Sequence, residues 1–183
     1  MGSEMCIRDR YSYAADQAAA DAIAAGESQN DVFVYTITDG TQDNTANITI
    51  KVLGANDNPS AQNDVGVVNE GSTLTVQNSA NANVDGSFDA NGEHSGDVIH
   101  TTSSSHKDSD LDTNDTLRIT QIKKSGGDNS SVSSGSSYNS SGTSVTGSYG
   151  TLTIGADGSY TYVASSNIAG LNDGATVSDT FTY

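Results

Sequence analysis

The residues with the clearest chemical potential are four aspartates in one short stretch, Asp108-Ser109-Asp110-Leu111-Asp112-Thr113-Asn114-Asp115. Ca²⁺ takes six to eight oxygen ligands at about 2.3–2.6 Å, and alternating aspartates in a bent loop can direct several oxygens toward one point. We therefore predict bound Ca²⁺ as the cofactor, with four candidate ligands: Asp108, Asp110, Asp112 and Asp115. The alternative is an acidic turn that is only solvated.

An EF-hand does not explain this stretch. Its loop also begins with aspartates at alternate positions, as Asp108, Asp110 and Asp112 do. It then requires a glycine and, at its last position, a bidentate glutamate. This chain has Thr113 and Ile119 at those two positions, so a different Asp-x-Asp loop is expected.

A second group of oxygen donors lies in Gly54-Ala55-Asn56-Asp57-Asn58-Pro59. Pro59 is the only proline, and because proline cannot donate a ladder hydrogen bond it predicts the end of a sheet and a domain boundary. Asn56, Asp57 and Asn58 are further candidate metal ligands. The alternative is an ordinary turn rich in Asn and Asp.

Other chemistries find little support in the sequence. His94, His100 and His106 are six residues apart, a spacing that matches no compact zinc motif. The chain contains no Gly-x-Ser-x-Gly elbow for a serine nucleophile. It also has no tryptophan to form the platform that usually accompanies paired carboxylates in a sugar cleft. We predict that the protein is not an enzyme.

Charge and composition favour a cation as partner. The net charge of −16 argues against binding to nucleic acid or to an anionic membrane. Leu, Ile, Val and Phe make up only 32 of the 183 residues, so bound cations are expected to assist folding. Cys6 is the only cysteine and can form no internal disulfide. No apolar run is long enough for membrane insertion.

The chain repeats itself. Tyr11-Ser12-Tyr13 and Tyr160-Thr161-Tyr162 are each followed by an Asp-x-Phe-x-Tyr sequence, at Asp31–Tyr35 and Asp179–Tyr183. The tyrosine pairs are 149 positions apart and the Asp-x-Phe-x-Tyr sequences 148 apart, which indicates a tandem repeat. The second copy stops where the first continues into a further strand. We therefore expect repeats that are truncated at both ends of the chain.

Short alternating segments predict an all-β fold, an Ig-like or cadherin-like Greek-key β-sandwich. The expected strands are residues 31–38, 45–53, 65–68, 73–76, 116–122, 151–154 and 159–162, the first two and the last two forming hairpins. The alanine-rich residues 14–25 predict one short helix in a connector. Low apolar content predicts flexible loops over 78–107 and 125–148.

These elements divide the chain into three parts. Residues 1–10 match nothing else in the sequence and are expected to be a non-native, unstructured leader. Residues 11–54 are predicted to be the C-terminal part of one sandwich repeat. Residues 55–183 are predicted to be a second repeat that lacks its last strand or strands.

Three features carry a family resemblance: the Gly-x-Asn-Asp-x-Pro boundary, the opening residues Asn63-Asp64 and Asn69-Glu70-Gly71, and the motif Gly147–Tyr162. Together they resemble the VCBS repeat, over residues 11–183. The resemblance implies a cadherin-like module of a large secreted or surface bacterial protein, often an RTX-type adhesin exported by type I secretion. It implies a non-catalytic spacer in cell adhesion and biofilm formation, located outside the cell or on the bacterial cell surface.

The resemblance also implies partners. The Asn56-Asp57-Asn58 segment resembles the cadherin linker, whose oxygens share Ca²⁺ with the Asp-x-Asp loop of the next module. Glu70 is expected at the opposite pole, as a ligand at the junction with a following repeat. The expected partners are neighbouring repeats, with a host surface, an abiotic surface or a glycan as further candidates. The alternative function is a carbohydrate- or ligand-binding adhesin module that uses residues 78–107.

Overall fold

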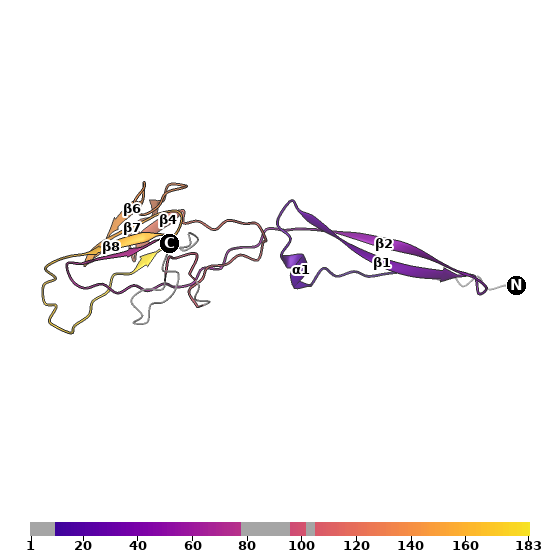
Figure 1. Ribbon diagram of the computed structural model, residues 1–183, viewed down its shortest axis with the longest axis horizontal. Coiled ribbons are helices and arrows are strands. Elements are labelled where there is room, and N and C mark those ends of the chain that lie inside the picture. The colour runs from indigo at the N-terminus through magenta and orange to yellow at the C-terminus, as the bar shows by residue number, and fades with distance from the viewer. Residues whose placement is uncertain (1–9, 78–95, 102–104) are drawn as a thin grey trace. The chain divides into compact units, whose positions relative to one another are not determined.

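A computed structural model describes residues 10–77, 96–101 and 105–183 of the chain (Figure 1). In that part the protein consists of antiparallel β-sheets and one short helix, α1 (Ala18–Asp21), which confirms the all-β prediction and the short helix. The predicted leader lies outside the described residues, except for Arg10. The chain forms two compact units, which we describe separately. Unit 1 comprises residues up to Asn58 and Leu111–Asp115, and unit 2 the remainder.

Unit 1 is built on one long hairpin of strands β1 (Ser28–Thr38) and β2 (Asp43–Leu53). Its turn forms because Asp39 Oδ1 accepts hydrogen bonds from the backbone N–H groups of Thr41 and Gln42, at 2.8 and 2.9 Å. Gly40 adopts a φ of +89°, which glycine tolerates without strain. The predicted hairpin is confirmed, and its strands are longer than predicted.

The described residues of unit 2 form two sheets. The four-stranded sheet has the order β3 (Thr73–Val76), β8 (Tyr160–Ala164), β7 (Gly150–Ile154) and β6 (Thr143–Thr146). The three-stranded sheet has the order β5 (Ser130–Ser131), β4 (Gln121–Lys124) and β9 (Phe181–Thr182). The predicted hairpin over 151–162 is confirmed as β7 and β8.

Both sheets of unit 2 contribute to one apolar core. Val76, Ile122 and Ile154 are each 1% exposed, and they represent β3, β4 and β7 respectively. Partly buried side chains pack against this core from other positions, including Tyr162, Phe181 and Tyr183. The second copy of the repeated sequence pattern therefore supplies core-facing residues.

Two strand predictions were wrong in their positions. Residues 65–68 form no strand, since only Gly66 makes a β-bridge there, and Val65 and Val67 are 45% and 60% exposed. The strand predicted over 116–122 begins only at Gln121 and continues to Lys124. In both cases the alternating pattern is present, but among the described residues neither 65–68 nor 116–120 belongs to a strand of any sheet.

The predicted loop 125–148 differs from expectation, and the predicted loop 78–107 is described only in part. Residues 125–148 contain β5 and β6, and Val132 between them is buried in the core. Residues 78–95 and 102–104 of the other loop lie outside the described residues. Within its described part, Asp97, Val98, Ile99 and Thr101 are at most 6% exposed, whereas Ser105 and Lys107 are exposed.

Candidate metal centre

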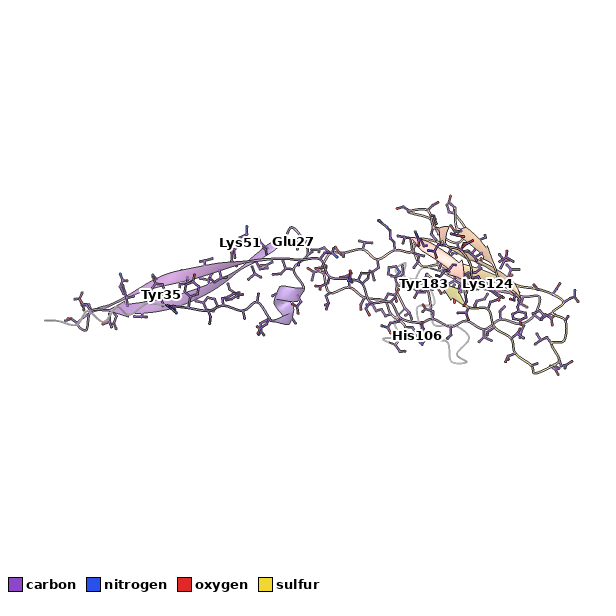
Figure 2. The ribbon with its side chains drawn as sticks, turned by 180° about the vertical axis from the view of Figure 1, so that it is seen from behind. Glu27, Tyr35, Lys51, His106, Lys124 and Tyr183 are labelled. Carbon is purple, nitrogen blue, oxygen red and sulfur yellow. The ribbon has the colours of Figure 1, made fainter. Side chains whose placement is uncertain are left out.

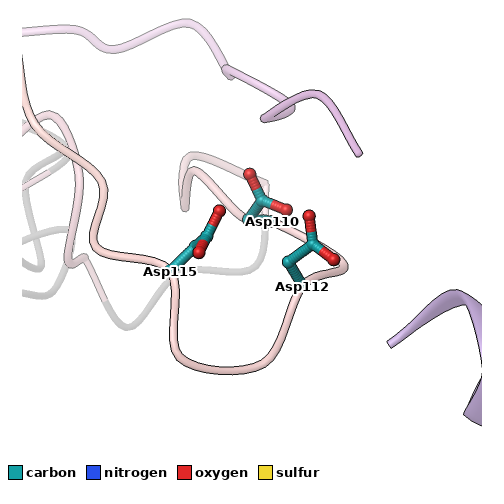
Figure 3. Close-up of side chains that lie close together, drawn as sticks. All are labelled: Asp110, Asp112 and Asp115. Atoms are coloured by element: carbon teal, nitrogen blue, oxygen red, sulfur yellow. The ribbon is translucent and has the colours of Figure 1, made fainter. Parts of the chain in front are cut away.

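We call residues Asp108–Asp115 the acidic loop. Three of the predicted carboxylate ligands lie close together within it (Figure 3). Asp110, Asp112 and Asp115 each offer a carboxylate oxygen, and these atoms all lie within 4.8 Å of one another. Asp112 is only 4% exposed, whereas Asp115 is exposed. Between them Asn114 adopts a φ of +89°, a conformation that Asn tolerates better than most residues and that bends the loop. Within the described ranges no other group of His, Cys, Asp and Glu has this geometry.

Contacts within unit 1 hold the C-terminal half of this loop. The backbone N–H of Asp57 donates a hydrogen bond to Asp112 Oδ2 at 2.7 Å. Thr113 Oγ1 donates to the Ala22 carbonyl oxygen at 3.0 Å, after the short helix α1. Asn114 Nδ2 donates to Glu27 Oε1 at 3.3 Å, just before β1. These contacts explain why Leu111–Asp115 belongs to unit 1, although the sequence predicted it as part of the second repeat.

The three predicted linker ligands, Asn56, Asp57 and Asn58, differ in their contacts with the acidic loop. Asp57 contacts Asp112 through its backbone, and its carboxylate is not a member of the group of three. Asn56 is exposed, and its Nδ2 donates to the Asp57 carbonyl oxygen at 2.5 Å. Asn58 is also exposed. The structure therefore brings one linker residue, Asp57, into direct contact with the loop.

Contacts within unit 2 hold the N-terminal half of the loop. Ser60 and Ser109 exchange two backbone hydrogen bonds, at 2.8 and 3.0 Å. Asp108 is 7% exposed and its Oδ1 accepts a hydrogen bond from the Gln62 N–H at 2.7 Å. Burial raises the pKa of Asp108 above its ordinary value, although the Gln62 hydrogen bond opposes that shift. Asp108 thus serves the loop's attachment and is not one of the three clustered carboxylates.

Glu70 lies apart from the group. It is exposed in the turn before β3, and its Oε1 accepts a hydrogen bond from the Ile168 N–H at 2.5 Å. In the same turn, the Gly71 N–H donates to the Ser165 carbonyl oxygen at 3.0 Å. The structure therefore associates Glu70 with the segment that follows β8.

The donor set of the loop suits a hard cation. Carboxylate oxygens favour Mg²⁺, Ca²⁺ or Mn²⁺, while zinc sites normally include imidazole or thiolate. The three carboxylates also carry like charges at short range, which a bound cation would neutralise.

The three histidines are placed differently. His106 Nδ1 lies 2.5 Å from the Asn63 carbonyl oxygen, and His100 Nδ1 lies 3.2 Å from Asp97 Oδ1. His94 falls outside the described residues.

The sequence did not lead us to single out two aspartates, Asp97, which is buried, and Asp179, which is half-buried. Asp97 has no exposed surface, and its Oδ1 accepts hydrogen bonds from the N–H groups of Ile99 and His100, at 2.9 and 2.7 Å. Asp179 accepts hydrogen bonds from a loop and from Tyr162. The repeated Asp-x-Phe-x-Tyr pattern was a signal for Asp179, whereas nothing in the sequence distinguished Asp97.

No protein-family model, curated protein or solved structure matches this chain. In the described part of the chain, no helix has the length and apolar character needed to cross a membrane. The function is therefore inferred from the geometry of the acidic loop and from the internal repeat.

Proposed function

We propose that this chain is a non-catalytic tandem-repeat module whose acidic loop binds Ca²⁺. The observation that carries the proposal is the grouping of Asp110, Asp112 and Asp115, with carboxylate oxygens within 4.8 Å of one another. Three carboxylates can supply three to six oxygens, and backbone carbonyls or water would complete the six to eight that Ca²⁺ prefers. The fold of each complete repeat would be a Greek-key β-sandwich of the Ig-like or cadherin-like kind.

The contact between the loop and the linker supports a mechanical role. Asp57 donates its backbone N–H to Asp112, so a cation that fixes the Asp112 carboxylate also fixes the chain just before Pro59. Without a cation, the like charges of the loop oppose its compact arrangement. Ca²⁺ would therefore stiffen the segment that joins consecutive repeats.

The cellular context of the proposal comes from the resemblance to VCBS repeats. In that context the module is a spacer of a large RTX-type adhesin, exported by type I secretion and acting in adhesion and biofilm formation. The high negative charge suits a site outside the cell, where free Ca²⁺ reaches millimolar concentrations and extracellular modules bind it with dissociation constants of about 10⁻⁴–10⁻³ M. Neighbouring repeats would be its first partners.

Isothermal titration calorimetry with CaCl₂ tests the binding. We expect saturable binding by the chain, and at least about tenfold weaker binding when Asp110→Asn, Asp112→Asn and Asp115→Asn are combined. Asparagine at 112 can still accept the hydrogen bond from Asp57. The matched control combines Asp16→Asn, Asp128→Asn and Asp173→Asn, which removes the same number of charges from exposed positions. Equal binding by the two triple variants would contradict the proposal.

The stiffening is tested separately by small-angle X-ray scattering. Addition of Ca²⁺ should narrow the distribution of interatomic distances, and EGTA should broaden it again. The triple variant of the acidic loop should show the broad distribution under both conditions. If Ca²⁺ binds but leaves the scattering curve unchanged, the loop is a cation site without a mechanical role.

A further inference from the structure

The segment that follows the linker is attached to the start of the acidic loop. Residues Ser60–Asp64, which we call the entry segment, lie outside the strands of unit 2. Ser60 exchanges two backbone hydrogen bonds with Ser109, at 2.8 and 3.0 Å, and the Gln62 N–H donates to Asp108 Oδ1 at 2.7 Å. Since Asp108 and Ser109 are the first two residues of the acidic loop, the paths of the entry segment and of this loop are fixed together.

Tyr183, which follows β9, contacts the entry segment through its hydroxyl. This hydroxyl lies 2.7 Å from Asp64 Oδ2 and 2.8 Å from the Gln62 carbonyl oxygen, and the Val98 carbonyl oxygen is 3.3 Å away. A hydroxyl donates one proton, so these acceptors share it. Figure 2 labels Tyr183, whose side chain is half-buried in unit 2. One side chain therefore joins the end of β9 to the entry segment.

The Tyr183 hydroxyl remains a donor at neutral pH. Burial raises its pKa above the ordinary value of 10.0, and the hydrogen bond to Asp64 raises the pKa further. Asp108 is another of its acceptors: burial raises the pKa of Asp108, whereas hydrogen bonds from Gln62 and Tyr183 lower it. The same hydroxyl thus contacts both the entry segment and the first residue of the acidic loop.

The repeated Asp-x-Phe-x-Tyr sequence divides its tasks among three residues in unit 2. Asp179 accepts hydrogen bonds from Ser148 and Tyr149, and Phe181 packs against the core. The Tyr183 ring also packs against the core, whereas its hydroxyl contacts the entry segment. The contribution of the hydroxyl can therefore be separated from core packing, because Tyr183→Phe keeps the ring.

We propose that the Tyr183 hydroxyl holds the entry segment in place and thereby positions the start of the acidic loop. Without it, the hydrogen bonds that attach Asp108 and Ser109 to the entry segment open more often. Asp110 follows Ser109 directly, belongs to the same unit and is one of the three clustered carboxylates, so its placement depends on this attachment. Tyr183 is therefore a positioning residue for the cation site. Only this last step rests on the proposed Ca²⁺ binding.

Hydrogen exchange of single amides, followed by NMR in EGTA, tests whether Tyr183 holds the entry segment. We expect the N–H groups of Gln62 and Ser109 to exchange at least about tenfold faster in the Tyr183→Phe variant. The physical reason is the loss of a hydrogen bond to a charged acceptor, which makes local opening of the entry segment more frequent. Unchanged exchange at Gln62 and Ser109 would overturn the proposal.

Tyr162→Phe is the matched control. The Tyr162 hydroxyl also donates to an aspartate at 2.7 Å, Asp179, and its side chain is also half-buried. This variant should speed exchange of the Ser148 and Tyr149 N–H groups, which donate to Asp179, and should leave the entry segment within about twofold of the wild type. If both variants speed exchange equally at both places, the effect is a general loss of stability and the proposal fails.

Isothermal titration calorimetry of the same two variants with CaCl₂ separates positioning of the loop from stability. At a temperature at which both variants are folded, we expect Tyr183→Phe to bind Ca²⁺ about three- to tenfold more weakly than the wild type, because a looser loop must be ordered on binding. Tyr162→Phe should stay within about twofold. Equal affinities of the two variants would overturn the positioning role. If the wild-type chain shows no saturable binding, the proposed function fails, and the exchange rates still decide whether Tyr183 holds the entry segment.

Discussion

The Tyr162 hydroxyl donates a hydrogen bond to Asp179 Oδ2 at 2.7 Å, which ties β8 to the segment that enters β9. The same carboxylate accepts hydrogen bonds from the N–H groups of Ser148 and Tyr149, at 2.6 and 2.9 Å. Gly147 has no room for a Cβ atom, because the Asp179 carboxylate occupies that space. One aspartate therefore holds together the loop at Ser148 and Tyr149, strand β8 and the segment that enters β9.

Replacing this carboxylate should destabilise unit 2 and alter its acid sensitivity. Desolvation opposes ionisation of Asp179, but its hydrogen bonds hold its pKa below the ordinary value of 3.8. Its stabilising effect is therefore fully present above pH 3.8 and is lost as pH falls through the lowered folded-state pKa. We expect Asp179→Asn to lower the free energy of unfolding by about 1–2 kcal/mol at pH 7, measured by urea denaturation.

Asp128→Asn is the control for this substitution, because Asp128 is exposed. It should change the free energy of unfolding by less than about 0.5 kcal/mol. Equal effects of the two substitutions at pH 7 would show that the Asp179 hydrogen bonds contribute nothing to stability.

The His100–Asp97 pair should give unit 2 a second pH dependence, near neutrality. The hydrogen bond to Asp97 raises the pKa of His100 above 6.5; burial opposes this, nearby Asp157 adds to it and Lys107 reduces it. Because the pKa of His100 is raised in the folded state, the pair stabilises the folded state fully below pH 6.5. This stabilisation is lost as pH rises through the folded-state pKa of His100. We expect the melting temperature of the chain to fall across that window. In the His100→Gln variant this fall in melting temperature should be absent, whereas the His106→Gln variant should retain it. If both variants lose the fall, the pH dependence does not come from the His100–Asp97 pair.

The segment 125–148 should unfold with the core of unit 2. Val132 is 7% exposed within it, so Val132→Ala should lower the free energy of unfolding by about 1–3 kcal/mol in urea denaturation. Val67→Ala is the same substitution at a 60% exposed position, and its effect should stay below about 0.5 kcal/mol. Similar small effects for both would mean that the segment is the flexible loop its composition suggests.

The sequence predicted the elements in which local pattern and turn chemistry agree. Both hairpins combine alternating strands with polar turns that contain a glycine, Gly40 in one and Gly158 in the other, and both glycines adopt positive φ. The pattern over 116–120 was equally regular but forms no strand, because a strand also requires a neighbour, and pairing depends on the path of distant segments.

The segment 125–148 was missed because its composition is rich in serine. Ser136 is 3% exposed, and its hydroxyl donates to the Ser133 carbonyl oxygen at 2.6 Å and accepts from the Ala156 N–H at 3.0 Å. A serine whose hydrogen bonds are satisfied can be buried, whereas composition alone marks it as a loop residue.

The acidic loop was predictable in part. The spacing of Asp110, Asp112 and Asp115 indicated convergent carboxylates, and the structure groups these three. Asp108 follows the same spacing, but its carboxylate accepts a hydrogen bond from Gln62, 46 positions earlier. That contact depends on how the chain returns after Pro59, which spacing within the loop does not reveal.

Thermal unfolding of the whole chain in CaCl₂ and in EGTA tests the central proposal most directly. A ligand that binds only the folded state stabilises by about 2.7 kcal/mol at a hundredfold excess over its dissociation constant, and 1 kcal/mol shifts the midpoint of a chain of this size by about 2–4 °C. We expect Ca²⁺ to raise the melting temperature by several degrees, with no such rise in the Asp110→Asn, Asp112→Asn, Asp115→Asn variant. Identical melting temperatures and circular dichroism spectra in millimolar Ca²⁺ and in EGTA would contradict the proposal that this chain is a Ca²⁺-stiffened repeat.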